Sequence, residues 1–307
     1  MTRGKLAFLF PGQGSQSVGM GRALAEAYPQ AREVFEQADA ALGRSISRLC
    51  FEGPEEDLVQ TANQQPALYA VSMAALAALR SRGVRPAAAA GHSLGEYGAL
   101  VAAGVFDWRT GLRLVAARGR AMQSAGQARP GAMAAVMAPL EVVRAACEAV
   151  GGGVQPVNFN SPEQTIISGE TAAVEAALER LKEMGARRTV RLPVSSAFHS
   201  PLMAEAVGPL SEALGQVRFA DPQIPVVANV TADAVKSGRE VKSLLERQVT
   251  GCVRWVESME RLGAMGFDTF VEVGNGRALA GLAKRINKAW TVHPSGTPEE
   301  VEELLRE

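Results

Sequence analysis

Residues 91–95 read Gly-His-Ser-Leu-Gly and lie between a short apolar segment and an amphipathic run at 96–103. A serine with glycine two positions away on either side is typical of a nucleophile elbow, a strand-to-helix turn in which larger side chains would clash. Such a turn exposes the hydroxyl of Ser93 at a helix N-terminus, where free backbone N–H groups can stabilise an oxyanion. In a chain with 31 glycines a plain loop is the alternative for this segment.

A serine hydroxyl needs a base to become a strong nucleophile, and histidine titrates in the suitable range. The chain has three histidines. His92 adjoins the serine and should point away from it as a packed residue, and His293 is expected on the surface. His199 lies in a polar loop that ends in proline. No carboxylate stands out as a partner for this imidazole, but a backbone carbonyl can accept its N–H. A Ser93–His199 pair without an aspartate is therefore possible.

The elements that position these residues alternate between apolar strands and amphipathic helices. Strands are expected at 6–10 and 87–90, although the second is almost all alanine, a poor strand former. A central parallel strand covered by helices on both faces accepts such small residues. Helices are expected at 66–79, with Pro66 in the first turn, at 96–103 and at 108–124. This pattern predicts an α/β fold.

Shorter elements follow from residue 132, in the order strand, helix, strand, strand, helix, strand. We expect these strands at 132–137, 154–158, 165–168 and 189–193, and the helices at 140–150 and 172–184. This βαββαβ order matches a small ferredoxin-like unit. Further strands at 224–229 and 269–273 and helices at 244–248, 253–262 and 278–285 return to the α/β pattern, and 299–307 is expected to be a frayed helical tail.

We therefore expect a large catalytic domain of residues 1–128 and 197–307, with an inserted subdomain of residues 129–196. Ligand sites favour the cleft between two such parts. His199 lies where the chain returns from the small part to the large one, which places it at this cleft.

The composition limits the possible partners of the chain. Its 32 basic and 32 acidic residues cancel, so no bulk charge favours a nucleic acid or an anionic membrane. Cys50, Cys147 and Cys252 lie far apart without metal-ligand spacing, which indicates a reducing cytoplasm. The apolar run at 6–10 is too short for a signal peptide, and that at 66–79 is too short to span a bilayer. We expect a cytoplasmic monomer that binds no metal.

Three motifs, taken together, make the chain resemble the malonyl-CoA:acyl carrier protein transacylases, the loading enzymes of fatty acid synthesis. They are Phe-Pro-Gly-Gln-Gly-Ser-Gln at 10–16, Gly-His-Ser-Leu-Gly-Glu-Tyr at 91–97, and Phe-His-Ser-Pro-Leu-Met at 198–203. The resemblance extends over nearly the whole chain. It implies a hydrolase-like parallel-sheet core with a ferredoxin-like insertion, and transfer of a malonyl group from malonyl-CoA to the phosphopantetheine thiol of acyl carrier protein, with no cofactor.

The resemblance also implies residue roles. Ser93 would be the nucleophile and His199 the base. The backbone N–H groups of Gln13 and Leu94 would bind the oxyanion. The main-chain carbonyl of Gln248 would hold the histidine.

Arg118 matches the family arginine that binds the malonyl carboxylate, and a guanidinium can bind a carboxylate through two parallel hydrogen bonds. Without the resemblance it would be interpreted as a helix-surface residue, because other arginines lie on the same helix. Asn160 and Gln65 fall in family-like segments and are expected to line the cleft. In related domains a Phe before the histidine goes with malonyl rather than methylmalonyl, so Phe198 predicts malonyl. Asn275 stands where the family usually has proline, and we expect a local effect only.

Acyl carrier proteins are acidic, so a basic patch is expected at the cleft mouth, with Arg277, Lys284, Arg285 and Lys288 as candidates; a solvated helix face is the alternative. Two other functions stay open. A serine esterase or thioesterase would use the same elbow with water as acceptor. A non-catalytic carrier-binding protein would retain the fold without the chemistry.

Overall fold

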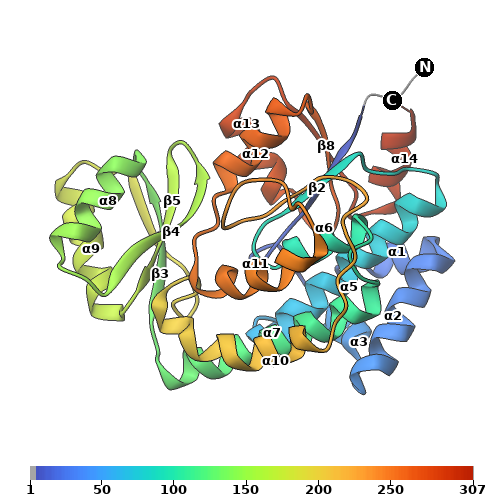
Figure 1. Ribbon diagram of the computed structural model, residues 1–307, viewed down its shortest axis with the longest axis horizontal. Coiled ribbons are helices and arrows are strands. Elements are labelled where there is room, and N and C mark those ends of the chain that lie inside the picture. Colours follow the sequence, from blue (N-terminus) through green and yellow to red (C-terminus); the bar gives the residue numbers. More distant parts are fainter. Residues whose placement is uncertain (1–4, 307) are drawn as a thin grey trace.

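The computed structural model describes residues 5–306, which form two sheets of different kinds (Figure 1). The larger sheet has five strands in the order β7-β2-β1-β8-β9, and all its neighbours are parallel. The strands are β1 (Ala7–Phe10), β2 (Ala88–Gly91), β7 (Val226–Val227), β8 (Thr269–Glu272) and β9 (Thr291–Pro294). The alanine-rich β2 is buried along its length between β1 and β7, as the sequence predicted. The chain has an α/β fold with a parallel sheet.

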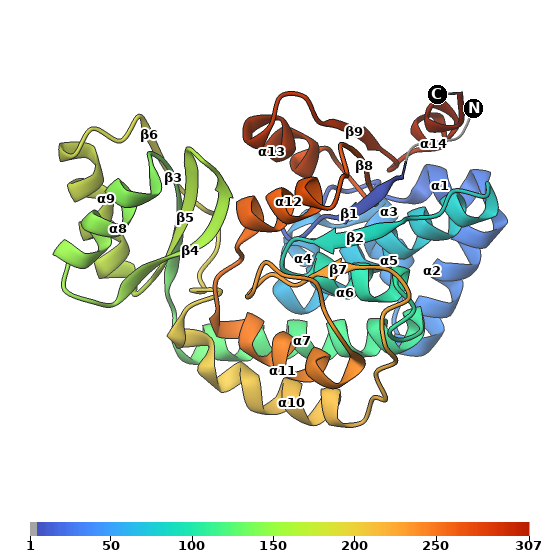
Figure 2. The same cartoon turned by 45° about the horizontal axis from the view of Figure 1, so that its top comes forward.

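Helices cover both faces of this sheet, and β1 shows the consequence. Phe8 and Phe10 belong to one hydrophobic cluster, whereas Ala7 and Leu9 belong to a second cluster on the opposite face. The first face packs against α5 (Thr61–Ser81), α6 (Gly95–Ala102) and α7 (Trp108–Ala128), and the second against α12 (Trp255–Ala264) and α13 (Ala278–Ile286) (Figure 2). The helices around these layers are α1 (Arg22–Ala27), α2 (Pro29–Leu42), α3 (Ile46–Glu52), α4 (Glu55–Leu58), the short η1 (Pro201–Ala206), α10 (Val207–Gly215), α11 (Gly238–Thr250) and α14 (Pro298–Arg306).

The smaller sheet is antiparallel, with four strands in the order β4-β5-β3-β6. Its elements are β3 (Ala132–Met137), α8 (Leu140–Ala149), β4 (Val154–Ser161), β5 (Gln164–Gly169), α9 (Thr171–Glu183) and β6 (Arg188–Arg191), in the predicted order. Both helices pack on this sheet around a core of its own. Strand β4 also contacts the larger part, because the N–H of Phe159 donates to the carbonyl of Val253 at 2.9 Å. Asn160 of β4 is also hydrogen-bonded, at 2.8 Å, to His92 directly after β2, so the small sheet lies beside the carboxyl end of β2.

Helix α5 begins at Thr61, so the prediction that Pro66 occupies its first turn was wrong. A proline inside a helix has no N–H for the carbonyl four residues earlier, here Ala62. That carbonyl accepts a hydrogen bond from Nη2 of Arg44 at 2.9 Å instead. The helix therefore continues through Pro66 because a side chain from another segment replaces the missing donor.

The expectation of a frayed C-terminal tail was also wrong. Helix α14 buries Val301 and Leu304, and its Glu302 accepts a hydrogen bond from the Tyr28 hydroxyl at 3.0 Å; residue 307 lies outside the described residues. Other boundaries differ as well. Helix α11 starts earlier than predicted, at a capping box of Ser237 and Glu240, and β7 is shorter than the predicted 224–229. No helix within residues 5–306 has both the length and the apolar character needed to cross a bilayer.

Candidate active site

The chain makes a sharp turn between β2 and α6, and Ser93 lies at its apex with a positive φ of 51°. Steric constraints explain why glycine occupies positions 91 and 95. A Cβ on Gly91 would lie 2.0 Å from backbone atoms of Gly95, and a Cβ on Gly95 would lie 1.9 Å from the carbonyl oxygen of Phe10. The helix can approach the strands this closely only without those side chains. The segment is thus a strand–turn–helix elbow rather than a plain loop.

The side chains of Ser93 and His199 meet although 106 positions separate them in the sequence. The Ser93 Oγ lies 2.8 Å from Nε2 of His199. The other ring nitrogen, Nδ1, lies 2.8 Å from the carbonyl oxygen of Gln248 and 3.2 Å from that of Gly251. Carbonyl oxygens only accept, so Nδ1 bears the hydrogen and Nε2 is free to accept from the serine hydroxyl. The histidine is therefore oriented by main-chain carbonyls, with no carboxylate.

The electrostatic environment keeps His199 neutral. Burial and, to a smaller extent, the positive charge of Arg118 lower the pKa of His199 to about 3, against the opposing effect of the hydrogen bond to the Gln248 carbonyl. The imidazole is therefore an unprotonated base at neutral pH.

Arg118, on α7, is fully buried with its guanidinium beside the serine. Its Nη2 donates to the Ser93 Oγ at 3.1 Å and to Oε1 of Gln248 at 3.0 Å, and its Nη1 donates to Oε1 of Gln65 at 2.8 Å. Its Nε is buried without a partner. All three acceptors are uncharged, and the ion pairs of residues 5–306 do not include Arg118. The interpretation of Arg118 as a helix-surface residue is thus excluded.

The loop after β1 brings Gln13 to the elbow. Gly12 faces the elbow backbone so closely that a Cβ on it would lie 2.5 Å from the carbonyl oxygen of His92. The Gln13 Oε1 accepts from Nε2 of Gln65 at 3.1 Å. Within residues 5–306, the backbone N–H groups of Gln13 and Leu94 donate to no protein acceptor.

Asn275 reinforces the same loop. Its Nδ2 donates to the carbonyl of Ser15 at 2.6 Å and to the hydroxyl of Ser17 at 3.0 Å. The asparagine that departs from the usual family residue therefore ties the loop by hydrogen bonds.

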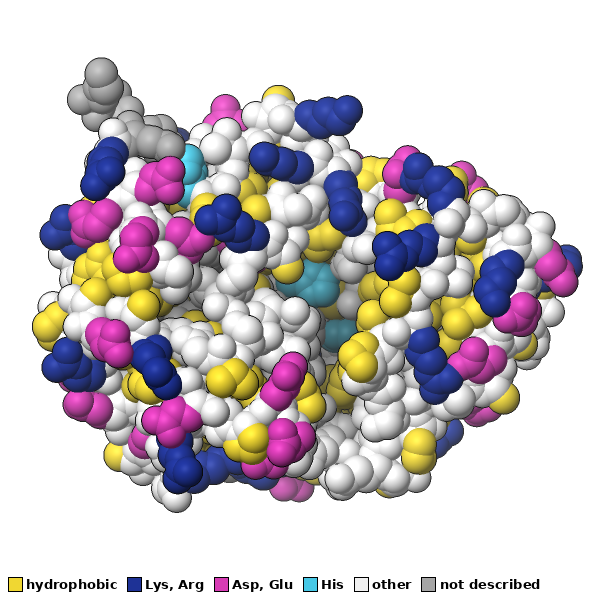
Figure 3. Space-filling view, turned by 180° about the vertical axis from the view of Figure 1, so that it is seen from behind, with side chains coloured by type: hydrophobic (Ala, Val, Ile, Leu, Met, Phe, Trp, Pro, Cys, Tyr) yellow, Lys and Arg dark blue, Asp and Glu magenta, His cyan; other side chains and the backbone are white. Residues whose placement is uncertain are grey.

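Other residues expected at the site lie around the pair. Asn160, at the end of β4, accepts a hydrogen bond from Nε2 of His92 at 2.8 Å, and the His92 ring packs against Trp255. His92 is thus a packed residue that points away from the serine hydroxyl. Phe198 is buried in the larger hydrophobic cluster directly before His199. His293, expected on the surface, is half-buried on edge strand β9. In the view from behind, histidine lies at the base of a hollow between the two parts of the molecule (Figure 3).

Asn229 and Glu96 belong to the site, and the sequence analysis missed both. The Asn229 Oδ1 accepts from the Ser93 backbone N–H, and its Nδ2 donates to the carbonyl of Gly91, both at 2.7 Å. The Glu96 Oε2 accepts from Nε2 of Gln248 at 2.7 Å. A signal was available for Asn229, since it follows an apolar run and polar residues at the carboxyl ends of parallel strands commonly line sites.

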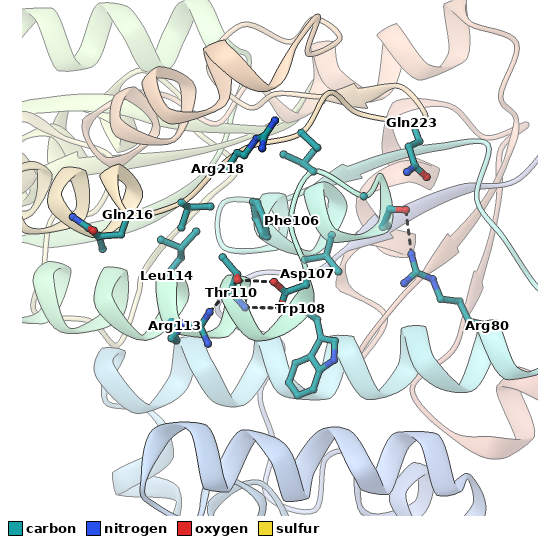
Figure 4. A pocket seen from close by; sticks show the side chains of 17 residues that line it. Arg80, Phe106, Asp107, Trp108, Thr110, Arg113, Leu114, Gln216, Arg218 and Gln223 are labelled. Atoms are coloured by element: carbon teal, nitrogen blue, oxygen red, sulfur yellow. Dashed lines mark hydrogen bonds between the residues drawn. The ribbon is translucent and has the colours of Figure 1, made fainter.

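A cavity of about 810 Å³ lies elsewhere in the molecule. It lies between the end of α6, the loop that leads into α7, the first turns of α7 and the segment after α10. Arg80 of α5, Phe106 and Arg218 are among the residues that line it (Figure 4). None of the residues expected at the site borders it. Within residues 5–306, no group of three or more His, Cys, Asp or Glu side chains is placed to hold a metal ion.

Comparisons with known proteins agree with this geometry. The family model described as "Acyl transferase domain" matches residues 7–304. The chain is 42% identical over 302 residues to the malonyl CoA-acyl carrier protein transacylase of Bacillus subtilis, covering 97% of this chain and 95% of that protein. It is 43% identical over 298 residues to the protein of the same name from Escherichia coli, with 96% of each chain covered.

Comparison with solved structures identifies proteins with the same names and a similar fold. A malonyl-transacylase in complex with a type II PKS acyl-carrier protein superimposes with a TM-score of 0.95 at 40% identity, over 99% of both chains. The malonyl CoA-acyl carrier protein transacylase of Coxiella burnetii also has a TM-score of 0.95, at 37% identity, over 98% of this chain and 97% of that one. The chain therefore belongs to the acyl transferase domain family.

Proposed function

We propose that this protein is a malonyl-CoA:acyl carrier protein S-malonyltransferase of fatty acid synthesis. One observation supports the assignment most directly: the Ser93 Oγ is hydrogen-bonded at once by a neutral histidine and by a buried arginine. The first contact suits acyl transfer through the serine, and the second supports the proposal that the arginine binds a substrate carboxylate. The names of the relatives that match the whole chain agree with this assignment.

In the first half-reaction, His199 takes the proton of the Ser93 hydroxyl through Nε2 while Oγ attacks the thioester carbonyl carbon. The oxyanion of the tetrahedral intermediate accepts hydrogen bonds from the backbone N–H groups of Gln13 and Leu94, which have no other acceptor within residues 5–306. The C–S bond then breaks, His199 returns the proton to the leaving sulfur, and CoA departs as its thiol. The product is a malonyl ester on Ser93.

In the second half-reaction, the phosphopantetheine thiol of the acyl carrier protein enters the site vacated by CoA. His199 removes the thiol proton, the sulfur attacks the ester carbonyl, and Ser93 leaves with the proton from His199. The kinetics should be ping-pong. The Gln248 and Gly251 carbonyls keep the imidazole in one tautomer throughout.

Arg118 and Gln65 are proposed to bind the malonyl carboxylate, because the buried Nε of the guanidinium is an unused donor. Asn160 is proposed to line the cleft. Phe198 is proposed to favour malonyl over methylmalonyl by limiting space for an α-methyl group. One methyl changes discrimination by ~1–3 kcal/mol, so comparing kcat/KM for the two CoA esters tests this role.

We propose that the transfer needs no cofactor, and that the enzyme is a monomer of the cytoplasm whose three cysteines are free. We also propose the division expected from the sequence, with residues 129–196 as a ferredoxin-like subdomain. The separate hydrophobic core of the antiparallel sheet supports this division.

Mass spectrometry after mixing the protein with malonyl-CoA tests the assignment. A malonyl adduct on Ser93 that moves to added holo-acyl carrier protein is the expected result. Rapid release of free malonate would indicate a serine esterase, and no adduct would indicate a non-catalytic binding protein. The Ser93→Ala variant is the control and should form no adduct.

A further inference from the structure

Glu96 is a buried carboxylate directly beneath the elbow, on the first turn of α6, and only 1% of it is exposed. Its Oε2 accepts two hydrogen bonds, from Nε2 of Gln248 at 2.7 Å and from the backbone N–H of Asn229 at 3.1 Å. Both donors are uncharged amides. The ion pairs of the described residues do not include Glu96. A buried charge held only by neutral donors is costly, so the nearest cation matters.

The nearest cation is Arg118, and the Gln248 amide joins the two groups. The nitrogen of this amide donates to Glu96, so its oxygen faces the opposite way and accepts from Nη2 of Arg118 at 3.0 Å. A single side-chain amide, that of Gln248, therefore lies between the Glu96 carboxylate and the Arg118 guanidinium, and all three groups are buried. Without a substrate they offset each other's charge.

A bound malonyl group changes this balance, since its carboxylate brings a second negative charge to a single buried guanidinium. Two carboxylates that share one cation out of water repel each other, and the system lowers its free energy if one of them binds a proton. Malonyl is the stronger acid and lies directly against the guanidinium. Glu96 keeps its neutral hydrogen-bond donors, and as the weaker acid it is the carboxylate that takes up the proton.

We propose that Glu96 is the internal counter-charge of Arg118 in the free enzyme and takes up a proton from solvent when a malonyl carboxylate binds to Arg118. This inference rests on the proposed function, because it assumes that the substrate has a carboxylate at that position. It makes Glu96 a positioning residue that acts on substrate affinity through Arg118.

The groups around Glu96 are compatible with this exchange. Burial raises the pKa of Glu96 to about 7, against the opposing effects of its two hydrogen bonds and of Arg118. Tyr97, on the same helix, has its pKa raised by burial and stays neutral. His199 is neutral as described above. Among the described residues of α11 and of the segment after β7, the groups that hydrogen-bond to the carboxylate are the uncharged amides of Gln248 and Asn229. A proton on Glu96 is thus available at little cost near neutral pH.

The exchange predicts a dependence of affinity on pH that only malonyl-CoA should show. Each proton taken up on binding weakens affinity about tenfold for every pH unit above the pKa of the free group. Acetyl-CoA has the same CoA phosphates but no malonyl carboxylate. The ratio of the two dissociation constants should therefore isolate the contribution of Glu96.

Calorimetry on the full-length Ser93→Ala protein measures this uptake without acyl transfer. Malonyl-CoA and acetyl-CoA are titrated at about pH 8 in buffers of different ionisation enthalpy, and the slope of the observed enthalpy gives the protons bound. At this pH most free Glu96 is ionised, whereas His199 stays neutral with either ligand. Malonyl-CoA should take up close to one proton more than acetyl-CoA.

Glu96→Gln, added to this protein, should abolish the difference. One carboxylate oxygen accepts both hydrogen bonds, so the amide oxygen of glutamine preserves them. Glu272→Gln is the control for the loss of another buried carboxylate. Glu272 is also buried, and burial raises its pKa to about 7 as well, but it accepts from backbone N–H groups of α13 and not from the site. This variant should keep the difference.

Three outcomes overturn the inference: equal proton uptake with both CoA esters, uptake that survives Glu96→Gln, or uptake that Glu272→Gln abolishes. If the protein with Glu96→Gln fails to fold, the Ser93→Ala protein that keeps Glu96 decides the question. In it the ratio of the malonyl-CoA and acetyl-CoA dissociation constants should rise from about pH 6 to 9, and a constant ratio refutes the inference. The proposed function has a separate test, since the wild-type protein still forms a malonyl–Ser93 adduct if only this inference is wrong.

Discussion

At the scale of single residues, Arg118 has the clearest chemical meaning. Its guanidinium is fully buried, yet its three hydrogen-bond acceptors are two glutamine side chains and one serine hydroxyl. Removing a cation from water in this way is unfavourable unless a negative group approaches it. We propose that the buried arginine binds a substrate carboxylate, with Glu96 as its counter-charge in the free enzyme.

Arg118→Lys keeps the charge but loses the planar group that can hold a carboxylate through two hydrogen bonds. We expect the ratio of kcat/KM for malonyl-CoA to that for acetyl-CoA to fall about 10- to 100-fold, or ~1.4–2.8 kcal/mol. Steady-state kinetics with both esters measures the ratio. Arg120→Lys, an exposed change on the same helix, is the control and should leave it unchanged. An unaltered ratio in Arg118→Lys would remove the proposed role.

His199 gives a second prediction, for the dependence of activity on pH. An exposed histidine base is lost by protonation as the pH falls through about 6.5. Burial and the charge of Arg118 lower the pKa of His199 to about 3, so its neutral, basic form persists far below that value. The kcat/KM for malonyl-CoA should not decrease between about pH 8 and pH 6. A fall centred near pH 6.5 would show that the base titrates like an exposed histidine.

At the scale of elements, the elbow depends on close backbone contact between α6 and β1. Gly95→Ala would place a methyl group 1.9 Å from a backbone oxygen, which must separate the helix from the strand. We expect a loss of at least ~2 kcal/mol in the free energy of unfolding, measured by urea denaturation. Gly281→Ala is the matched control, because this helical glycine has no atom within reach of a new Cβ. The control should gain about 0.5–1 kcal/mol.

The elements also show which parts of the structure were predictable. The elbow and the buried alanine strand follow from local information, since spacing and side-chain size within a few residues determine them. Helix α5 was misjudged because the donor that replaces the Pro66 N–H comes from Arg44, in a different segment. Asn229 and Glu96 were missed for a related reason: their partners lie in distant parts of the sequence, and only the folded chain brings them together.

At the scale of the whole molecule, we propose that the acyl carrier protein reaches Ser93 through the hollow between the two parts of the molecule (Figure 3). Helix α13 packs near β4, and its exposed Lys284 and Arg285 are followed by exposed Lys288. Arg277 differs from these residues because it forms an ion pair with Glu300. Among the ion pairs of the described residues none includes Lys284, Arg285 or Lys288, so these three side chains are the candidates for the expected basic patch.

Reversing two of these charges, as in Lys284→Glu combined with Lys288→Glu, should slow malonyl transfer to acyl carrier protein about tenfold or more at low salt. Acylation of Ser93 by malonyl-CoA should stay within about twofold of wild type, because neither residue contacts the reacting groups. Rapid-quench measurements separate the two half-reactions. Arg48→Glu, on α3 in the lower part of Figure 1, is the control. Equal slowing by both variants would contradict a specific docking surface.

Ser93 and His199, the two proposed reacting residues, have left-handed backbone conformations, with φ of 51° and 62°. Such conformations cost an L-residue about 1 kcal/mol each, and glycine escapes this cost. Glycine at position 93 should therefore stabilise the fold. A Ser93→Gly protein should melt at a higher temperature than a Ser93→Ala protein, although neither has a hydroxyl. Selection for thermal stability alone would therefore favour glycine at position 93, and the protein would lose the hydroxyl.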